Sequence, residues 1–249
     1  MRGRAFVGTS GWVYKHWRGA VFEKGLAQKS WLKRIAEVFD TVEVNTSFYR
    51  IPQPETVEAW VNQTPDGFLF ALKLWRGITH YRKLVNAGDL TERFLRSAEK
   101  VPSHRRAPVL IQLPPNQKPN PGKLEKYIAE FRTLSNNGWR IAVEFRDDAW
   151  YTRSTYELLD RLDVSLCVHD MQGKGANDLS NEATFVYVRR HGSSEQSYAG
   201  SYSPAAIRRD TGKIRSWLDQ DRDVFVYYNN DIGGHAYRNA LELRAALRR

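Results

Sequence analysis

With 249 residues, of which 41% are hydrophobic and 12% aromatic, the chain is long enough to form one large domain with a substantial core. A mean hydropathy of -0.59 and the lack of any apolar stretch near the roughly 20 residues of a spanning helix exclude a membrane protein. The formal net charge of +10 favours anionic partners, either an anionic small molecule or nucleic acid. The single cysteine, Cys167, excludes a disulfide framework and a thiolate metal cluster. No signal-peptide pattern follows Met1, so a cytoplasmic location is expected, and the sequence does not indicate the oligomeric state.

Eight short apolar runs recur along the chain and predict eight β-strands. They cover residues 5–8, 41–45, 68–74, 108–113, 140–146, 163–169, 184–190 and 223–229. Short runs rich in Val, Ile, Leu and Phe are typical of strands that are buried on both faces of a parallel sheet.

Helical patterns occupy most of the segments between these runs. Apolar residues at intervals of three and four predict helices over residues 30–39, 54–61, 89–100, 121–134, 154–162, 204–218 and 236–247. Strands that alternate with helices indicate repeated βαβ units, and eight strands with a closing helix favour a single TIM-like (β/α)8 barrel over residues 1–249. Residues 171–183 are rich in Gly, Asn and Asp and predict one degenerate βα unit. An open doubly wound sheet is the alternative fold.

Polar residues gather at or just after the carboxyl ends of the predicted strands. In a parallel α/β barrel these ends lie on one face, where TIM-barrel enzymes hold their active sites. We therefore predict an enzyme with one pocket on that face. The candidate substrate-binding residues are Ser10, Trp12, Asn45, His80, Gln112, Arg146, His169, Arg189, His191, Tyr228, Asn229, Asn230 and Asp231.

Three ionisable residues, Glu43, Lys73 and Glu144, lie within predicted strands and are the candidate catalytic residues. Alternate residues of a barrel strand point into the interior, where a charge must be paired, so we expect Lys73 to lie between the two carboxylates. One interpretation is a structural network of ion pairs that ties the strands together. The other is acid–base catalysis by groups whose pKa values are shifted by burial. Lys73 could also form a Schiff base with a carbonyl substrate, although nothing in the sequence singles out that reaction.

Two arginines, Arg146 and Arg189, are suited to hold an anionic group, because a guanidinium can bind phosphate or carboxylate with two donors. Strand alternation turns only one of Arg189 and Arg190 inward, and we expect it to be Arg189. The histidines and carboxylates near the same face could bind a divalent metal. A metal-free, hydrogen-bonded site is favoured, because no histidine pair has the spacing of a helical ligand motif.

Several short motifs follow one another in a fixed order over almost the whole chain. They are GTSGW at residues 8–12, VEVNTSFY at 42–49, Lys73 with Thr79-His80, QLPP at 112–115, EFR at 144–146, and YYNND at 227–231 followed by His235-Ala236. In this order they resemble the DUF72 family, also called YecE-like, whose last motif commonly begins Tyr-Phe where this chain has Tyr227-Tyr228. The resemblance implies a TIM-like barrel related to the superfamily of endonuclease IV and xylose isomerase, and it implies no established activity.

The function predicted from these features is an enzyme that acts on an anionic, phosphorylated substrate, with phosphoester hydrolysis as the concrete reaction. One alternative is a non-catalytic protein that binds single-stranded nucleic acid through its basic surface and the aromatic residues near the same face. These aromatic residues are Trp12, Tyr14, Trp17, Phe48, Tyr49 and Trp75. The other alternative is a metal-independent acid–base enzyme that acts on a small sugar or carbonyl compound.

Overall fold

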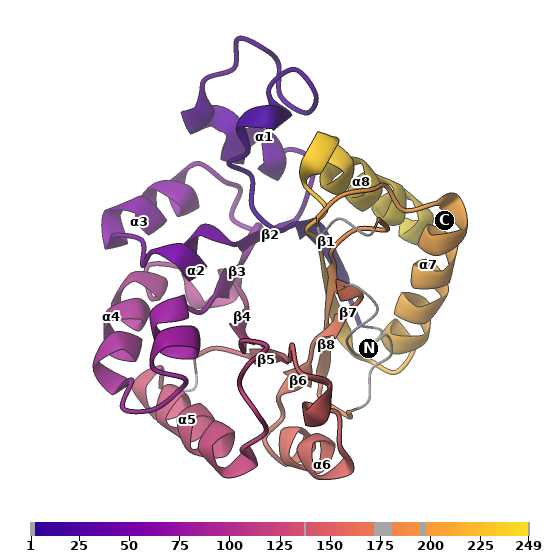
Figure 1. The fold of residues 1–249 in the computed structure, drawn as a ribbon. Helices are drawn as coiled ribbons and strands as arrows, with labels where there is room; N and C mark the ends of the chain where they lie inside the picture. Colours follow the sequence, from indigo (N-terminus) through magenta and orange to yellow (C-terminus); the bar gives the residue numbers. More distant parts are fainter. Residues whose placement is uncertain (1–2, 137, 172–180, 195–197, 249) are drawn as a thin grey trace.

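The computed structural model describes residues 3–136, 138–171, 181–194 and 198–248, and its strands form a parallel barrel surrounded by helices (Figure 1). The strands are β1 (Ala5–Thr9), β2 (Thr41–Val44), β3 (Leu69–Lys73), β4 (Arg106–Gln112), β5 (Ile141–Glu144), β6 (Ser165–Leu166), β7 (Val168–His169), β8 (Phe185–Arg190) and β9 (Asp223–Tyr228). β6 and β7 are two halves of one strand, separated by Cys167, whose backbone N–H donates to the carbonyl of Val143 at 2.8 Å. Within the described residues the strands therefore occupy eight positions, and the predicted fold is confirmed.

Parallel pairing joins the strands into two runs, β2-β3-β4-β5-β6 and β7-β8-β9-β1. The barrel closes between β1 and β2, where Ser10 and Glu43 form a parallel bridge. Just beyond it, the backbone N–H of Gly11 donates to the carbonyl of Glu43 at 2.7 Å. Gly8 permits this closure, because a Cβ at that position would lie 2.1 Å from the backbone oxygen of Thr41.

Replacing Gly8 by Ala is expected to lower the free energy of unfolding by about 1–3 kcal/mol, because the added methyl group overpacks the β1–β2 contact. Urea denaturation followed by circular dichroism measures the change. Gly67→Ala is the matched control, since no atom lies within 4 Å of a Cβ added there. Equal stability of the two variants would show that the barrel closure tolerates a wider spacing.

The helices form the outer layer and follow the strands in the predicted order. They are α1 (Trp31–Ala36), α2 (Thr46–Tyr49), α3 (Pro54–Asn62), α4 (Gly88–Ala98), α5 (Pro121–Leu134), α6 (Arg153–Arg161), α7 (Pro204–Leu218) and α8 (His235–Arg248). α2, which is one turn long, and a π-helical turn at Gly77–Tyr81 were not predicted. The degenerate unit expected at 171–183 falls mainly on residues 172–180, which lie outside the described residues. Across the described ranges, no helix combines the length and apolar character that crossing a membrane requires.

The barrel interior is divided into an apolar layer and a charged layer. In the apolar layer, aromatic side chains from β1, β8 and β9 pack against Leu110 of β4 and against small side chains from β3, β4, β5 and the β6–β7 position. The large residues are Phe6, Phe185, Tyr187, Phe225 and Tyr227, and the small ones are Ala71, Ala107, Ala142 and Cys167. This pairing of large with small fills the interior at normal protein density. Towards the carboxyl ends of the strands, the interior residues become ionisable.

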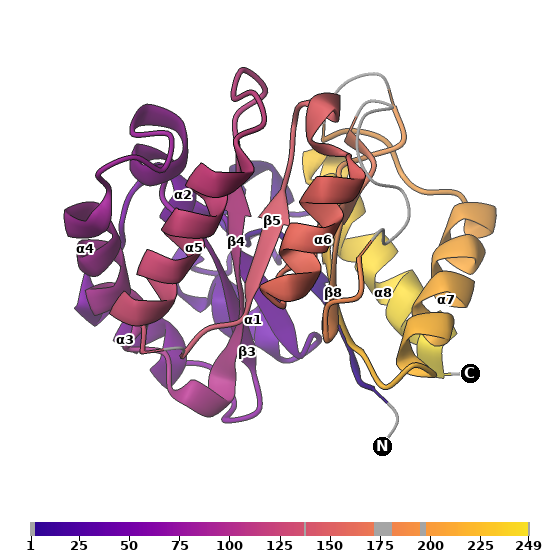
Figure 2. The same cartoon turned by 90° about the horizontal axis from the view of Figure 1, so that it is seen from below.

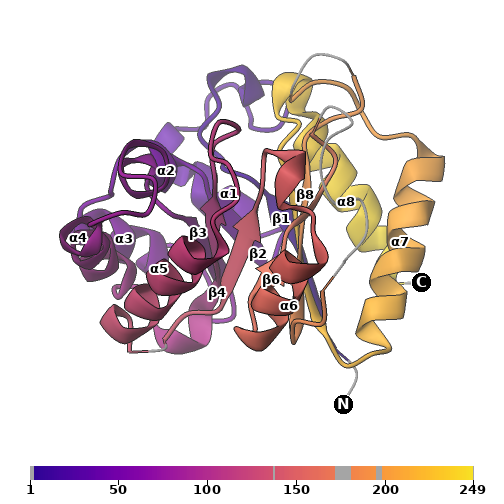
Figure 3. The same ribbon diagram turned by 60° about the horizontal axis from the view of Figure 1, so that its bottom comes forward.

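The carboxyl ends of the strands lie at the end of the barrel marked by α2, the helix that directly follows β2. Side views place α2 at the opposite end of the barrel from the labelled chain termini (Figure 2, Figure 3). The charged interior layer therefore lies towards the face on which the sequence predicts the functional site.

Candidate functional site

Arg189 of β8 reaches across the barrel interior and pairs with a carboxylate on each of two other strands. Its Nη2 lies 2.8 Å from Oε1 of Glu43, and its Nη1 lies 2.7 Å from Oε2 of Glu144; all three side chains are fully buried. The expectation that Lys73 would lie between the two carboxylates is wrong, because the longer, forked side chain of Arg189 fills that place with two donors. The inward direction of Arg189 is confirmed, since Arg190 turns outward to a carboxylate of α7.

Both carboxylates of this network are held in the ionised form. Burial alone would raise the pKa of Glu43, but the charges of Arg189 and Lys73 and hydrogen bonds from Ser10 and Tyr187 lower it below its usual value. The hydroxyl of Tyr187 donates to Oε2 of Glu43 at 2.7 Å, and the hydroxyl of Ser10 donates to Oε1.

Glu144 is neutralised by two guanidinium groups. Arg146 forms an ion pair with its Oε1, beside the contact from Arg189. Against the effect of burial, these two charges hold the pKa of Glu144 well below its usual value. Together the two arginines and two carboxylates of the layer, Arg146, Arg189, Glu43 and Glu144, carry no net charge.

His191 lies against this network as a neutral imidazole. Its Nε2 is 3.1 Å from Nη1 of Arg189 and 3.3 Å from Nη2 of Arg146. A guanidinium can only donate, so Nε2 accepts and the ring proton is on Nδ1, which lies 3.6 Å from Oδ1 of Asp170. Burial lowers the pKa of His191 to about 4, although the nearby carboxylate of Asp170 opposes this shift. His191 therefore acts as an acceptor for the arginines at neutral pH.

Lys73 is the cation of the layer that no carboxylate binds. Its Nζ lies 3.9 Å from the centroid of the Phe48 ring, and within the described residues no carboxylate oxygen lies within 4.0 Å of it. The side chain is 5% exposed. Burial, together with the charge of Arg189, lowers the pKa of Lys73 to about 7, although Glu144 and Glu43 oppose the shift. About half of the Lys73 side chains are therefore neutral amines at pH 7.

A pocket of about 280 Å³ opens beside Lys73. Its lining residues are Gly11, Val13, Tyr14, Asn45, Thr46, Tyr49, Lys73, Tyr198, Asn229 and Asp231. Asn45 brings a buried Oδ1 that has no hydrogen-bond partner among the described residues, and Asn229 is 5% exposed. A pocket of this size with amide, carboxylate and amine groups suits a small polar molecule.

Asp231 connects the pocket wall to the start of the chain. Its carbonyl accepts hydrogen bonds from Nε1 of Trp17 at 2.8 Å and Nε2 of His16 at 2.9 Å. Burial raises the pKa of the Asp231 carboxyl, and the neighbouring His16 offsets part of this rise. A carboxyl group with a raised pKa is suited to give or take a proton inside the pocket.

The structure sorts the predicted site residues into three groups. Asn45, Lys73, Asn229 and Asp231 line the pocket. Ser10, Glu43, Glu144, Arg146, Arg189 and His191 form the buried network beneath it. The remaining residues are His80, Gln112, His169, Trp12, Tyr228 and Asn230. No group of three or more His, Cys, Asp and Glu side chains in the described ranges is arranged to hold a metal ion.

His80, His169 and Gln112 lie next to the network without lining the pocket. Nδ1 of His80 is 2.8 Å from the hydroxyl of Thr79, and burial and the charge of Lys73 lower the pKa of His80 to about 4. His169 is fully buried, with Nε2 3.0 Å from the carbonyl of Phe145. Gln112 is 9% exposed and pairs in register with Glu144.

Trp12, Tyr228 and Asn230 are not among the residues that line the pocket, and their contact with a substrate stays a prediction. Trp12 packs edge-on against Trp60, with the ring centroids 5.5 Å apart. Strand alternation turns Tyr228 out of the barrel, because Tyr227 faces inward. The amide of Asn230 donates to the carbonyl of Gly200 at 2.9 Å and so fixes the end of β9.

Sequence reasoning missed the walls of the pocket that come from loops and short helices. Thr46 and Tyr49 belong to α2, which is too short to show a helical period. Tyr14 and Tyr49 were expected among the aromatic residues of this face, but Val13 and Tyr198 carried no motif. Tyr198 lies in a connection without periodicity and has a positive φ of 66°.

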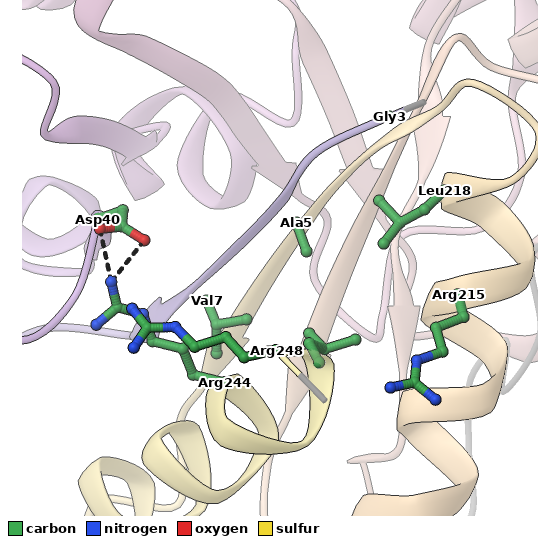
Figure 4. A pocket seen from close by; sticks show the side chains of 9 residues that line it. Gly3, Ala5, Val7, Asp40, Arg215, Leu218, Arg244 and Arg248 are labelled. Carbon is green, nitrogen blue, oxygen red and sulfur yellow. Dashed lines mark hydrogen bonds and ion pairs between the residues drawn. The ribbon is translucent and has the colours of Figure 1, made fainter. Parts of the chain in front are cut away.

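A larger cavity of about 620 Å³ lies at the opposite end of the barrel, where β1 begins and α7 and α8 end (Figure 4). Its lining combines apolar residues with arginines, of which Arg244 pairs with Asp40 at 2.8 Å and Arg215 donates to the carbonyl of Ala246 at 3.0 Å. Arg215 and Arg244 are thus held by groups of the protein, and Arg248 also lines the cavity. Because the chemistry of α/β barrels is found at the carboxyl ends of the strands, the pocket beside Lys73 is the candidate site.

Comparisons with known proteins agree with the motifs. The family model described as "Protein of unknown function DUF72" matches residues 6–249. The UPF0759 protein YunF of Bacillus subtilis is 27% identical over 273 aligned positions, which cover 96% of this chain and 93% of YunF. The crystal structure of a DUF72 family protein from Thermotoga maritima has a TM-score of 0.84 at 25% identity and covers 99% of this chain and 100% of its own.

The fold is also shared with TIM-barrel enzymes. A family 2 AP endonuclease from Brucella melitensis has a TM-score of 0.51 and covers 92% of this chain and 93% of its own. Its identity to this chain is 11%, so the likeness concerns the fold alone. The family match extends over nearly all of the sequence, and the resemblance seen in the motifs is confirmed: the chain belongs to the DUF72 family.

Proposed function

We propose that the protein is an enzyme that uses the amine of Lys73 on a small, hydroxylated carbonyl compound such as an open-chain sugar. The observation that carries this proposal is the position of Lys73, a buried amine without a carboxylate partner at the wall of a polar pocket. Its pKa of about 7 makes a large share of the amine neutral at physiological pH. Burial next to other cations is a known means of activating a lysine as a nucleophile.

The reaction begins with addition of the neutral Nζ of Lys73 to the carbonyl carbon of the substrate. The former carbonyl oxygen takes up protons and leaves as water, and a protonated imine then joins Nζ to the substrate carbon. Asp231, which lines the same pocket and has a raised pKa, is the group suited to supply and remove protons. The positive imine withdraws electrons from the adjacent carbon–hydrogen or carbon–carbon bond, which prepares the substrate for bond cleavage or isomerisation.

The remaining pocket groups fit a hydroxylated substrate. The unpartnered Oδ1 of Asn45 can accept a hydrogen bond from a hydroxyl group, and Asn229 adds a second amide. Tyr49 and Tyr198 line the outer part of the pocket, where aromatic side chains can pack against the carbon skeleton of the substrate. A volume of about 280 Å³ accommodates a small molecule of this kind.

A phosphorylated substrate stays a prediction, and hydrolysis of a phosphoester is less well supported by the geometry. The guanidinium groups of Arg146 and Arg189, which the sequence suggested as anion contacts, already pair with Glu144. A phosphate would have to displace a buried carboxylate from them, at a cost of several kcal/mol. The carbonyl chemistry of Lys73 requires no such exchange.

Reductive trapping tests the proposal. Incubation with glyceraldehyde and borohydride at pH 7 should convert the imine into a stable secondary amine on Lys73, detected by peptide mass spectrometry. Labelling of exposed Lys126 on the outer helix α5 serves as the internal reference. In the Lys73→Met variant the adduct at position 73 should be absent, and the labelling of Lys126 should be unchanged. Labelling of Lys73 no faster than that of Lys126 would contradict the proposal.

A further inference from the structure

The rim of the pocket carries two exposed tyrosines on either side of an arginine. Tyr49 is 57% exposed and Tyr81 is 68% exposed. The guanidinium carbon of Arg76 lies 5.4 Å from the ring centroid of Tyr49 and 5.6 Å from that of Tyr81. Two exposed rings thus lie beside a half-buried guanidinium, and Tyr49 is also part of the pocket wall.

The exposed large apolar side chains of the described residues all lie in the connections that follow the carboxyl ends of strands. They are Val13, Tyr49, Tyr81, Val85, Tyr198 and Ile232. A monomeric protein usually scatters such residues over its surface, and their concentration on one face is typical of a binding surface.

Four cations, Arg50, Arg76, Arg82 and Lys83, accompany the two tyrosines of this rim. Arg50, Arg82 and Lys83 are exposed and adjoin the two tyrosines in the chain. Within the part of the chain that the structure describes, none of them pairs with a carboxylate, and neither does Arg76. Some other exposed arginines are neutralised, as in the pairs Arg34–Glu37, Arg153–Glu157 and Arg161–Glu125. The rim is therefore a local positive surface.

The backbone fixes the shape of this rim. After β3 the chain forms the π-helical turn Gly77–Tyr81, and then Lys83, Leu84 and Asn86 adopt left-handed φ values of 49°, 67° and 48°. Such conformations cost free energy in residues other than glycine and are retained mainly at functional sites. Buried Leu84 anchors the turn, so Tyr81 to Lys83 are held outward in one arrangement.

We propose that this rim platform, formed by Tyr49, Arg50, Arg76, Tyr81, Arg82 and Lys83, binds single-stranded nucleic acid. Unpaired bases stack on tyrosine faces and on a guanidinium plane, and the free cations next to them meet the phosphates. A duplex hides the faces of its bases, so it would use the charges of the platform but not its rings. The proposal is independent of the chemistry of Lys73, although a bound strand would pass the mouth of the pocket at Tyr49.

Fluorescence anisotropy with labelled 12-residue oligothymidine DNA and oligouridine RNA tests this proposal, with a DNA duplex of equal length as the comparison. The single strands should bind more tightly than the duplex at equal salt. Tyr81→Ala should weaken single-strand binding by about 5- to 150-fold, whereas Tyr81→Phe should keep it. Removing both charges in Arg82→Ala/Lys83→Ala should reduce the slope of log affinity against log salt by roughly 1.4.

Two control variants separate this surface from other parts of the protein. Lys126→Ala removes an exposed charge on α5 and should leave the affinity unchanged. Lys73→Met should also keep the affinity, so failure of the Lys73 chemistry and failure of the platform can be told apart. Equal binding of duplex and single strand, or unchanged binding by Tyr81→Ala, would overturn the proposal.

Discussion

Replacing Arg189 by Met is expected to lower the free energy of unfolding by about 3–5 kcal/mol. The substitution removes the cation that binds Glu43 and Glu144, and it leaves two buried carboxylates, one of which retains Arg146. Urea denaturation followed by tryptophan fluorescence measures the loss. Because the low pKa of Glu43 depends on Arg189, this carboxyl should take up a proton more readily in the folded variant than in the unfolded chain. The variant should therefore gain stability relative to the unaltered protein as the pH falls from 7 towards 5.

The matched control removes Arg189 together with Glu43, because Glu144 keeps its ion pair with Arg146. Arg189→Met combined with Glu43→Gln should recover much of the lost stability, because no carboxylate is then left buried without a cation. A single variant as stable as the double variant would show that water reaches the carboxylates. In that case the network would contribute little to holding the strands together.

The second large effect is expected in the reactivity of Lys73. At pH 7 the neutral fraction of an amine of pKa about 7 exceeds that of an ordinary lysine by roughly 1,000-fold. Competitive labelling with trace acetic anhydride from pH 5 to 10 should give a midpoint near pH 7 for Lys73. Arg146→Gln should move the Lys73 midpoint upward, because the charge of Arg146 lowers this pKa. A midpoint near 10 for Lys73 would contradict the assignment.

The lowered pKa of Lys73 also makes the free energy of unfolding depend on pH. Between pH 7 and 10 the unfolded chain keeps a proton on Lys73 that the folded protein has lost, so stability should rise with pH over this window. Lys73→Met has no such proton. The free energy of unfolding of the unaltered protein should therefore increase relative to that of Lys73→Met as the pH is raised, and parallel curves would indicate an ordinary lysine.

The fold could be predicted because its local patterns agree with its packing. Helices α5 and α7 begin and end where the sequence indicates, since each starts with a proline after a capping residue. Asn120 and Ser203 accept the hydrogen bonds that cap them. The four residues of α2 and the π-helical turn are too short to show a helical period in the sequence. The segments that build the pocket rim could therefore not be predicted.

The interior charges show what the alternation of residues along a strand can and cannot predict. Alternation along the strands correctly turned Glu43, Lys73, Glu144 and Arg189 inward. It could not tell which cation would join the carboxylates, because that depends on the stagger between distant strands and on side-chain length. Lys73 lies two residues beyond Ala71, the residue in register with Glu43, and so it lies nearer the mouth of the barrel. Arg189 could span the interior from β8, on the other side.

The hydrogen bonds of Trp17 and His16 to the carbonyl of Asp231 connect the beginning of the chain to its end. The pocket takes its walls from the first three βα units and from the last two, and none of its lining residues comes from the middle of the sequence. During synthesis on the ribosome, the growing chain can form early helices and strands while the pocket is still missing a side. The amine of Lys73 becomes buried only when the final strand has emerged and the barrel has closed. In an unfinished chain it would therefore be an ordinary lysine.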